Sequence, residues 1–169
     1  MIQADFSNAH TDLSDPSLAK RVAKIHERLH HHPDLMCGWV QYPFQISDQM
    51  LDDITKEAEA VRNRCSVFIV IGIGGSYLGT IAGVNLLRPP FDEGGTIGNP
   101  RIIFAGHHLS SHYYNHLMTV IEDPKEEICI CMVSKSGSTT EPKVIYAIIK
   151  EALLCIHRQD PVRQDWSVY

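Results

Sequence analysis

VFIVIGIGGSYLG at residues 67–79 is the stretch that decides the fold, and ICICMVSKSGSTTEP at residues 128–142 has the same layout. Each begins as an apolar run rich in β-branched residues and ends abruptly in a loop of glycine and hydroxyl residues, after which a helical pattern follows. This layout predicts a parallel strand that leads into a helix, with the loop at the carboxyl end of the strand. Because ligands of open α/β sheets bind at those ends, we expect the two loops to form one binding region.

The rest of the chain predicts a helical lead-in followed by alternating strands and helices. Amphipathic patterns predict lead-in helices at residues 17–32 and 47–64. Strands are then expected at 66–71, 101–105 and 128–133, helices at 78–87, 112–120 and 141–157, and the start of a further strand at 167–169. This order predicts an α/β fold, a three-layer α/β/α sandwich with a parallel sheet. The predicted domains are the helical lead-in at 1–65 and an α/β subdomain at 66–169, which we expect to be truncated because its last strand is cut short.

The composition is that of a globular protein, with 44% hydrophobic residues, 21% charged residues and a formal net charge of -5. The negative charge and the lack of a basic stripe argue against nucleic-acid binding. No apolar stretch is long enough to span a bilayer, and the amino terminus lacks the pattern of a secretion signal. The five cysteines form no C-x-x-C pair, and Cys129 and Cys131 alternate in a predicted strand, where we expect small buried side chains on one sheet face. These features predict a cytoplasmic protein that does not enter a membrane.

The first loop, GIGGSYLG at residues 72–79, can bring its backbone close to a ligand because its glycines lack a Cβ atom. The free amides at the start of the following helix favour an anion. A dinucleotide fingerprint starting at Gly72 fails because Tyr77 stands where the third glycine is required, and a P-loop pattern starting at Gly74 fails because Thr80 replaces its lysine. A tight turn without any ligand remains an alternative for this loop alone.

The second loop, SKSGSTTEP at residues 134–142, offers hydroxyl groups that can donate hydrogen bonds to phosphate oxygens without the cost of burying another charge. Lys135 adds one cation, although a solvated surface lysine is an equally good interpretation of it. Either Thr139 or Thr140 can cap the helix that follows. Taken together, the two loops favour a phosphate site. The hydroxyl residues are Ser134, Ser136, Ser138, Thr139 and Thr140.

These residues resemble glucose-6-phosphate isomerases of the shorter bacterial type, which are built on the sugar-isomerase (SIS) fold. VIGIGGSYLG is similar to the first signature of that family, and SKSGSTTEP is similar to its S-K-S-G-T-T-T-E-P, with Ser138 in place of a threonine. The likeness extends more weakly to GWVQYP and to FAGHHLSSHYYNHL, where His107 and His108 depart from a family pattern that usually includes asparagine. It covers about residues 36–169, the amino-terminal SIS subdomain of that family.

The resemblance implies the aldose–ketose isomerisation of glucose 6-phosphate and fructose 6-phosphate, a step of glycolysis and gluconeogenesis. It implies a sugar phosphate ligand, no cofactor, no metal, and a homodimer in the full-length family. By position in the motifs, the groups that would hold the phosphate are Ser134, Ser136 and Thr139, with Ser138 and Lys135 beside them, while Gly75 and Ser76 would face the sugar.

The resemblance assigns no catalytic residue to this chain. In the family the glutamate, histidine and lysine that handle protons, and the arginine that steadies the enediol, lie in a later part of a longer chain. We therefore expect negligible isomerase activity from these 169 residues alone. Two alternatives remain open, a stand-alone SIS module that binds phosphosugars and regulates a partner, and a fragment without function.

Ten histidines raise the question of a metal site. His108, His112 and His116 recur every four residues and would share one face of a continuous helix, a spacing that can hold zinc. No carboxylate or cysteine completes the set, and Ser110 and Ser111 indicate that the helix begins only after His108. We therefore expect no metal site.

Overall fold

The structure is a computed structural model that describes residues 5, 7–8, 15–31, 37–89, 99–159 and 167–168. The chain forms two compact units, Met1–Asp53 and Ile54–Tyr169. The division between them falls earlier than the predicted boundary between residues 65 and 66. The assignment of residues 1–65 to a single lead-in therefore stays a prediction.

The lead-in contains the two long helices that the amphipathic patterns predicted, and between them in sequence two short helices that were not predicted. It contains α1 (Pro16–His31), α2 (Gly38–Gln41), the short 3-10 helix η1 (Tyr42–Phe44) and α3 (Asp48–Arg62). The Asp15 carboxylate accepts a hydrogen bond from the Ser17 backbone N–H at 2.8 Å, and proline fits the first helical position because it has no N–H to leave unpaired. Ser47 caps α3 in the same way, since its hydroxyl accepts from the Met50 N–H at 3.2 Å. Residue 32, the predicted end of the first helix, lies outside the described residues.

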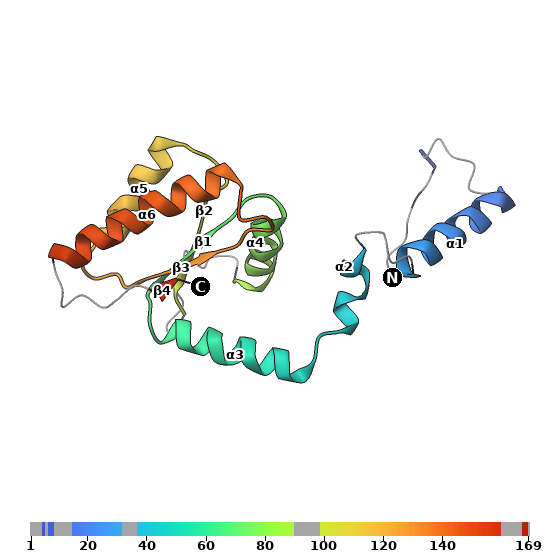
Figure 1. The fold of residues 1–169 in the computed structure, drawn as a ribbon, viewed down its shortest axis with the longest axis horizontal. Coiled ribbons are helices and arrows are strands. Elements are labelled where there is room, and N and C mark those ends of the chain that lie inside the picture. The colour runs from blue at the N-terminus through green and yellow to red at the C-terminus, as the bar shows by residue number, and fades with distance from the viewer. Residues whose placement is uncertain are drawn as a thin grey trace. The chain divides into compact units, whose positions relative to one another are not determined.

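The second unit is a parallel sheet with helices on both faces, which confirms the predicted α/β/α sandwich. The strands lie in the order β2-β1-β3-β4. In Figure 1, α5 and α6 lie together on one face of the sheet and α4 lies on the other. In chain order, the elements are β1 (Val67–Ile71), α4 (Gly75–Leu87), β2 (Arg101–Ala105), α5 (Ser111–Ile121), β3 (Ile128–Met132), α6 (Thr140–Gln159) and β4 (Ser167–Val168).

The period-two pattern of β1 divides the core between the two faces of the sheet. Val67, Ile69 and Ile71 are fully buried beneath α5 and α6, where Ile145 and Ile149 pack against them. Such a continuous apolar strand suits a parallel sheet that is covered on both sides.

The opposite face of the sheet holds a smaller cluster at the end of α3. Val61 and Cys65 pack there with Cys129, and Phe68 of β1 lies against them. Cys129 is buried and Cys131, two residues further along the same strand, is half-buried, as expected for small side chains on one face. All the cysteines lie in the described ranges, and none of them forms a disulfide bond. Across those ranges, no helix has both the length and the apolar character needed to cross a membrane.

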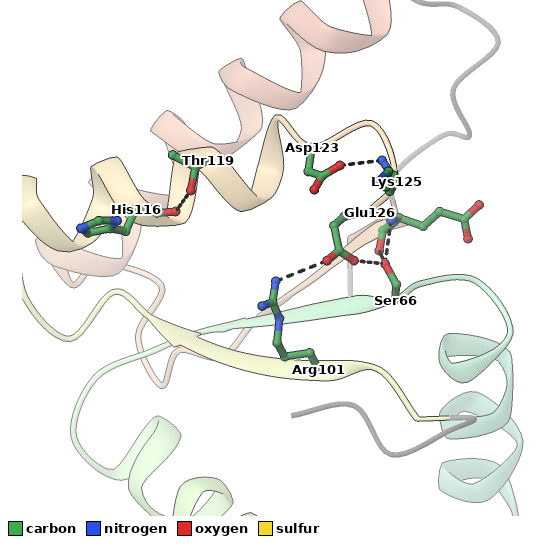
Figure 2. Close-up of polar contacts among 8 residues, drawn as sticks. Ser66, Arg101, His116, Thr119, Asp123, Lys125 and Glu126 are labelled. Atoms are coloured by element: carbon green, nitrogen blue, oxygen red, sulfur yellow. Dashed lines mark hydrogen bonds and ion pairs between the residues drawn. The ribbon is translucent and has the colours of Figure 1, made fainter. Parts of the chain in front are cut away.

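A polar clamp joins the amino-terminal ends of the three long strands. Figure 2 shows the Glu126 carboxylate between the Ser66 hydroxyl, which donates to it, and the Arg101 guanidinium, which lies 3.5 Å away. The same hydroxyl accepts from the Glu127 backbone N–H at 2.9 Å. Ser66 therefore links the start of β1 to the segment that enters β3.

Replacing Ser66 with alanine is expected to lower the free energy of unfolding by about 1 kcal/mol, because one hydroxyl serves two hydrogen-bond partners. The Arg101–Glu126 pair is partly exposed and adds little by itself. Urea denaturation of Ser66→Ala beside Ser111→Ala, a change at an exposed serine at the start of α5, measures the difference. Equal free energies of unfolding in the two variants would show that the polar clamp does not stabilise the protein.

Candidate functional site

The carboxyl ends of three strands meet at one edge of the sheet. The register aligns Ile71 of β1 with Ala105 of β2 and Met132 of β3. Two backbone hydrogen bonds, both of 2.9 Å, extend this alignment into the loops: Gly72 N–H donates to the Ala105 carbonyl, and Val133 N–H donates to the Ile71 carbonyl. The chain leaves β1 towards β2 and then returns across β1 to β3, so the direction of winding reverses between β1 and β3. Ligands of open α/β sheets bind at such a reversal.

The first predicted loop, which begins at Gly72 and is called the glycine loop below, lies close to the loop after β3. A Cβ atom on Gly72 would lie 3.2 Å from the Val133 carbonyl oxygen and 3.3 Å from the Cβ of Ser76. Gly74, with φ of 57°, makes the turn into the helix. The lack of a side chain at Gly72 therefore lets the two predicted binding loops come into contact.

Gly75 and Ser76 are the first two residues of α4, which begins three residues earlier than the predicted start at residue 78. The prediction was wrong because the turn at Gly74 starts the helix at once, with the Leu78 N–H donating to the Gly74 carbonyl at 3.0 Å. Among the described residues, apart from the two neighbours of Gly75 and the backbone of its own helix turn, no atom lies within 4 Å of the position that a Cβ on Gly75 would take. The first turn of α4 is thus open to a ligand on this side.

The loop at residues 134–139, called the serine loop below, is held together by hydrogen bonds to its own hydroxyl groups. Ser134 Oγ accepts from the Gly137 N–H at 2.9 Å, and Ser136 Oγ accepts from the Ser138 N–H at 3.2 Å. The hydroxyls of Ser136 and Ser138 lie 2.7 Å apart and share one hydrogen bond. Gly137, with φ of 64°, makes the tight turn within this loop, a backbone conformation that favours glycine.

This network leaves hydrogen-bond donors for a ligand. A hydroxyl that accepts still has its own proton to donate, so Ser134 retains its donor and the Ser136–Ser138 pair uses only one of two. Thr139 is half-buried and immediately precedes α6, which begins at Thr140. Lys135 is exposed, and the first turn of α6 carries the carboxylate of Glu141. Because these two charges oppose each other, neutral donors and the helix amino terminus are the main attraction for an anion.

A third loop, after β2, belongs to the same edge and was missed from the sequence. Gly106 has φ of 84°, and a Cβ there would lie 2.9 Å from Ile71 Cγ2 and 3.2 Å from Pro142 Cα. The Tyr114 hydroxyl accepts from the Gly106 N–H at 2.8 Å and donates to the His108 carbonyl at 3.0 Å. A glycine directly after a predicted strand was the available signal, but its contacts come from tertiary packing.

Aromatic rings connect this third loop to the glycine loop. His107 stacks on Tyr77 of α4, with ring centroids 5.0 Å apart and an interplanar angle of 18°. Burial lowers the pKa of the His107 imidazole below its usual value, and the neighbouring His108 acts in the same direction. The carboxyl edge of the sheet therefore has a stacked pair of aromatic rings next to Gly75 and Ser76 in the chain.

The histidines that raised the metal question do not share one face. His108 precedes α5 and its ring contacts Tyr113 and Tyr114, whereas the rings of His112 and His116 pair edge to face on α5 itself, 4.7 Å apart. Within the described ranges, no group of three histidine, cysteine or acidic side chains is placed to hold a metal ion.

The chain is similar to curated proteins named glucose-6-phosphate isomerase. The relative from Leptospira interrogans is 43% identical over 116 residues, which cover 69% of this chain and 25% of that protein. Those from Acholeplasma laidlawii and Alkaliphilus metalliredigens are 37% and 33% identical, and each match covers 89% of this chain and 35% of the relative. No family model matches the chain. The chain thus spans between a quarter and about a third of the length of these relatives.

Proposed function

Because the chain belongs to the glucose-6-phosphate isomerase family, we propose that the carboxyl edge of its sheet binds the phosphate group of a hexose 6-phosphate. The observation that carries this proposal is the loop at residues 134–139, where a network of hydroxyls leaves donors free beside the start of α6. A phosphate needs many donors and little steric bulk around it, which this loop provides.

The proposed roles follow the positions of the residues on that edge. Ser134, Ser136 and Thr139 grip the phosphate oxygens. Ser138 supports Ser136, and Lys135 adds a charge at the rim. The sugar lies towards the first turn of α4, over Gly75 and Ser76, where the space above Gly75 is open among the described residues.

For the whole protein we propose the reversible isomerisation of glucose 6-phosphate to fructose 6-phosphate, in the cytoplasm and as a homodimer. The reaction moves a proton between two carbons and needs a correctly placed base, a contribution of about 10²- to 10⁴-fold. Phosphate binding at a distance from those carbons holds the sugar in place while the proton moves. In this proposal the base comes from outside the region that the chain shares with its relatives.

Calorimetric titration tests the binding proposal directly. The purified 169-residue protein is expected to bind glucose 6-phosphate and fructose 6-phosphate at least about tenfold more tightly than glucose, because the charge-assisted hydrogen bonds are made to the phosphate. A coupled assay on the same preparation is expected to show no isomerase turnover above background. Equal binding of glucose and glucose 6-phosphate would refute the phosphate site, and normal turnover would refute the absence of the base.

A further inference from the structure

The stacked pair of His107 and Tyr77 joins two loops that are far apart in the sequence. Tyr77 follows Gly75 and Ser76 directly, and its backbone N–H donates to the Gly74 carbonyl at 3.2 Å. Its ring therefore projects from the same turn as those residues, one position after Ser76. His107 is the ring that lies parallel to it, at the start of the loop after β2.

His107 is held by ring contacts and not by hydrogen bonds at its buried nitrogen. Among the described residues, its Nδ1 atom is buried and has no hydrogen-bond partner. The rings of His108 and Tyr113 meet it edge-on, at centroid distances of 4.3 Å and 6.0 Å. A buried polar atom without a partner is unfavourable, so packing around the ring must outweigh that cost.

The loop that carries His107 is bound to α5 by hydrogen bonds on both sides of that residue. Tyr114 bonds both to Gly106 and to the carbonyl of His108, and so secures the residues on either side of His107. The Tyr113 hydroxyl donates to the Phe104 carbonyl at the end of β2. The Tyr77 ring also contacts Phe104, with centroids 6.0 Å apart. The end of β2 and the loop after it thus pack against Tyr77 in the first turn of α4.

We propose that His107 is a positioning residue for the sugar-phosphate site, which acts by stacking on Tyr77 and so fixes the turn that carries Gly75 and Ser76. This inference rests on the proposed function, because it concerns the same site. His107 does not touch the reacting carbons in this role. Because the stacked pair orders the turn before the sugar binds, less conformational entropy is lost on binding.

Calorimetric titration with glucose 6-phosphate tests the proposal on two variants of His107. One variant removes the whole ring, and the other removes only the ring nitrogens. His107→Ala is expected to weaken binding about 3- to 10-fold, the range that one aromatic pair supports, and His107→Phe is expected to restore it because a flat ring suffices. His112→Ala is the matched control, since it removes one ring of the exposed pair on α5 and is expected to leave affinity unchanged. Tyr77→Leu removes the other ring and is expected to weaken binding as His107→Ala does.

The double variant His107→Ala with Tyr77→Leu is expected to lose no more affinity than either single variant, because both act through one contact. Amide NMR spectra provide a second readout: the Gly75 and Ser76 signals should move in His107→Ala and return in His107→Phe. If glucose 6-phosphate binds the unaltered protein and His107→Ala binds it equally well, this inference fails alone. It also fails if His107→Phe does not restore binding, or if the losses add in the double variant. If the unaltered protein binds no sugar phosphate, the proposed function fails and this inference falls with it.

Discussion

Gly106→Ala is expected to destabilise the protein by about 2–5 kcal/mol, a large part of the roughly 5–15 kcal/mol that stabilises a typical domain. Two costs combine. Alanine is strained at φ of 84°, and its Cβ would lie 2.9 Å from Ile71 and 3.2 Å from the backbone of Pro142. Because Ile71 and Pro142 are both buried, neither neighbour can move without disturbing the core. Urea denaturation followed by circular dichroism measures the loss.

Gly79→Ala is the matched control for this experiment. Gly79 lies inside α4, where an added Cβ meets no atom within 4 Å, and alanine favours a helix by about 1 kcal/mol over glycine. The control should therefore be as stable as the unaltered protein or slightly more stable. If Gly106→Ala unfolds at the same urea concentration as Gly79→Ala, the close packing of the three loops is wrong.

Ser136→Asp is expected to weaken the binding of glucose 6-phosphate about 100-fold. The substitution removes a donor from the serine loop and places a carboxylate where the phosphate is proposed to lie. Two like charges about 4 Å apart repel by about 4 kcal/mol at the effective dielectric of a protein surface, and because the loop is exposed, salt screens part of this repulsion. Calorimetric titration at two salt concentrations should show the loss and its partial recovery at the higher one.

Thr119→Asp is the control for the added charge. Thr119 is exposed on α5, near the end of the helix that leads towards the amino-terminal edge of the sheet (Figure 2). This substitution changes the net charge of the protein by the same amount as Ser136→Asp. The affinity for glucose 6-phosphate is expected to stay within about twofold because solvent screens the new charge. An equal loss of affinity in both variants would mean that net charge, and not a phosphate at Ser136, explains the result.

The sequence predicted the order of strands and helices from β1 onwards, and the strand β2 to the residue, because apolar runs bounded by loops indicate strands directly. It also predicted that the loops after β1 and β3 lie together at the carboxyl edge, since parallel strands place these loops on one side. It did not predict the short helices α2 and η1. It missed the start of α4 at Gly75, because Gly-rich segments suggest loops even where a helix begins. It missed Gly106 and His107 as parts of the same edge, because their contacts with Ile71 and Tyr77 exist only after β1 and β2 have paired.

The polar clamp at Ser66 and the carboxyl edge of the sheet lie at opposite ends of the same strands. The five residues of β1 separate them by about 16 Å. Substitutions that far apart usually have additive effects. Substitutions in the loops can therefore change which ligand binds without weakening the polar clamp that stabilises the sheet. A library randomised at one end should yield variants that combine freely with those selected at the other.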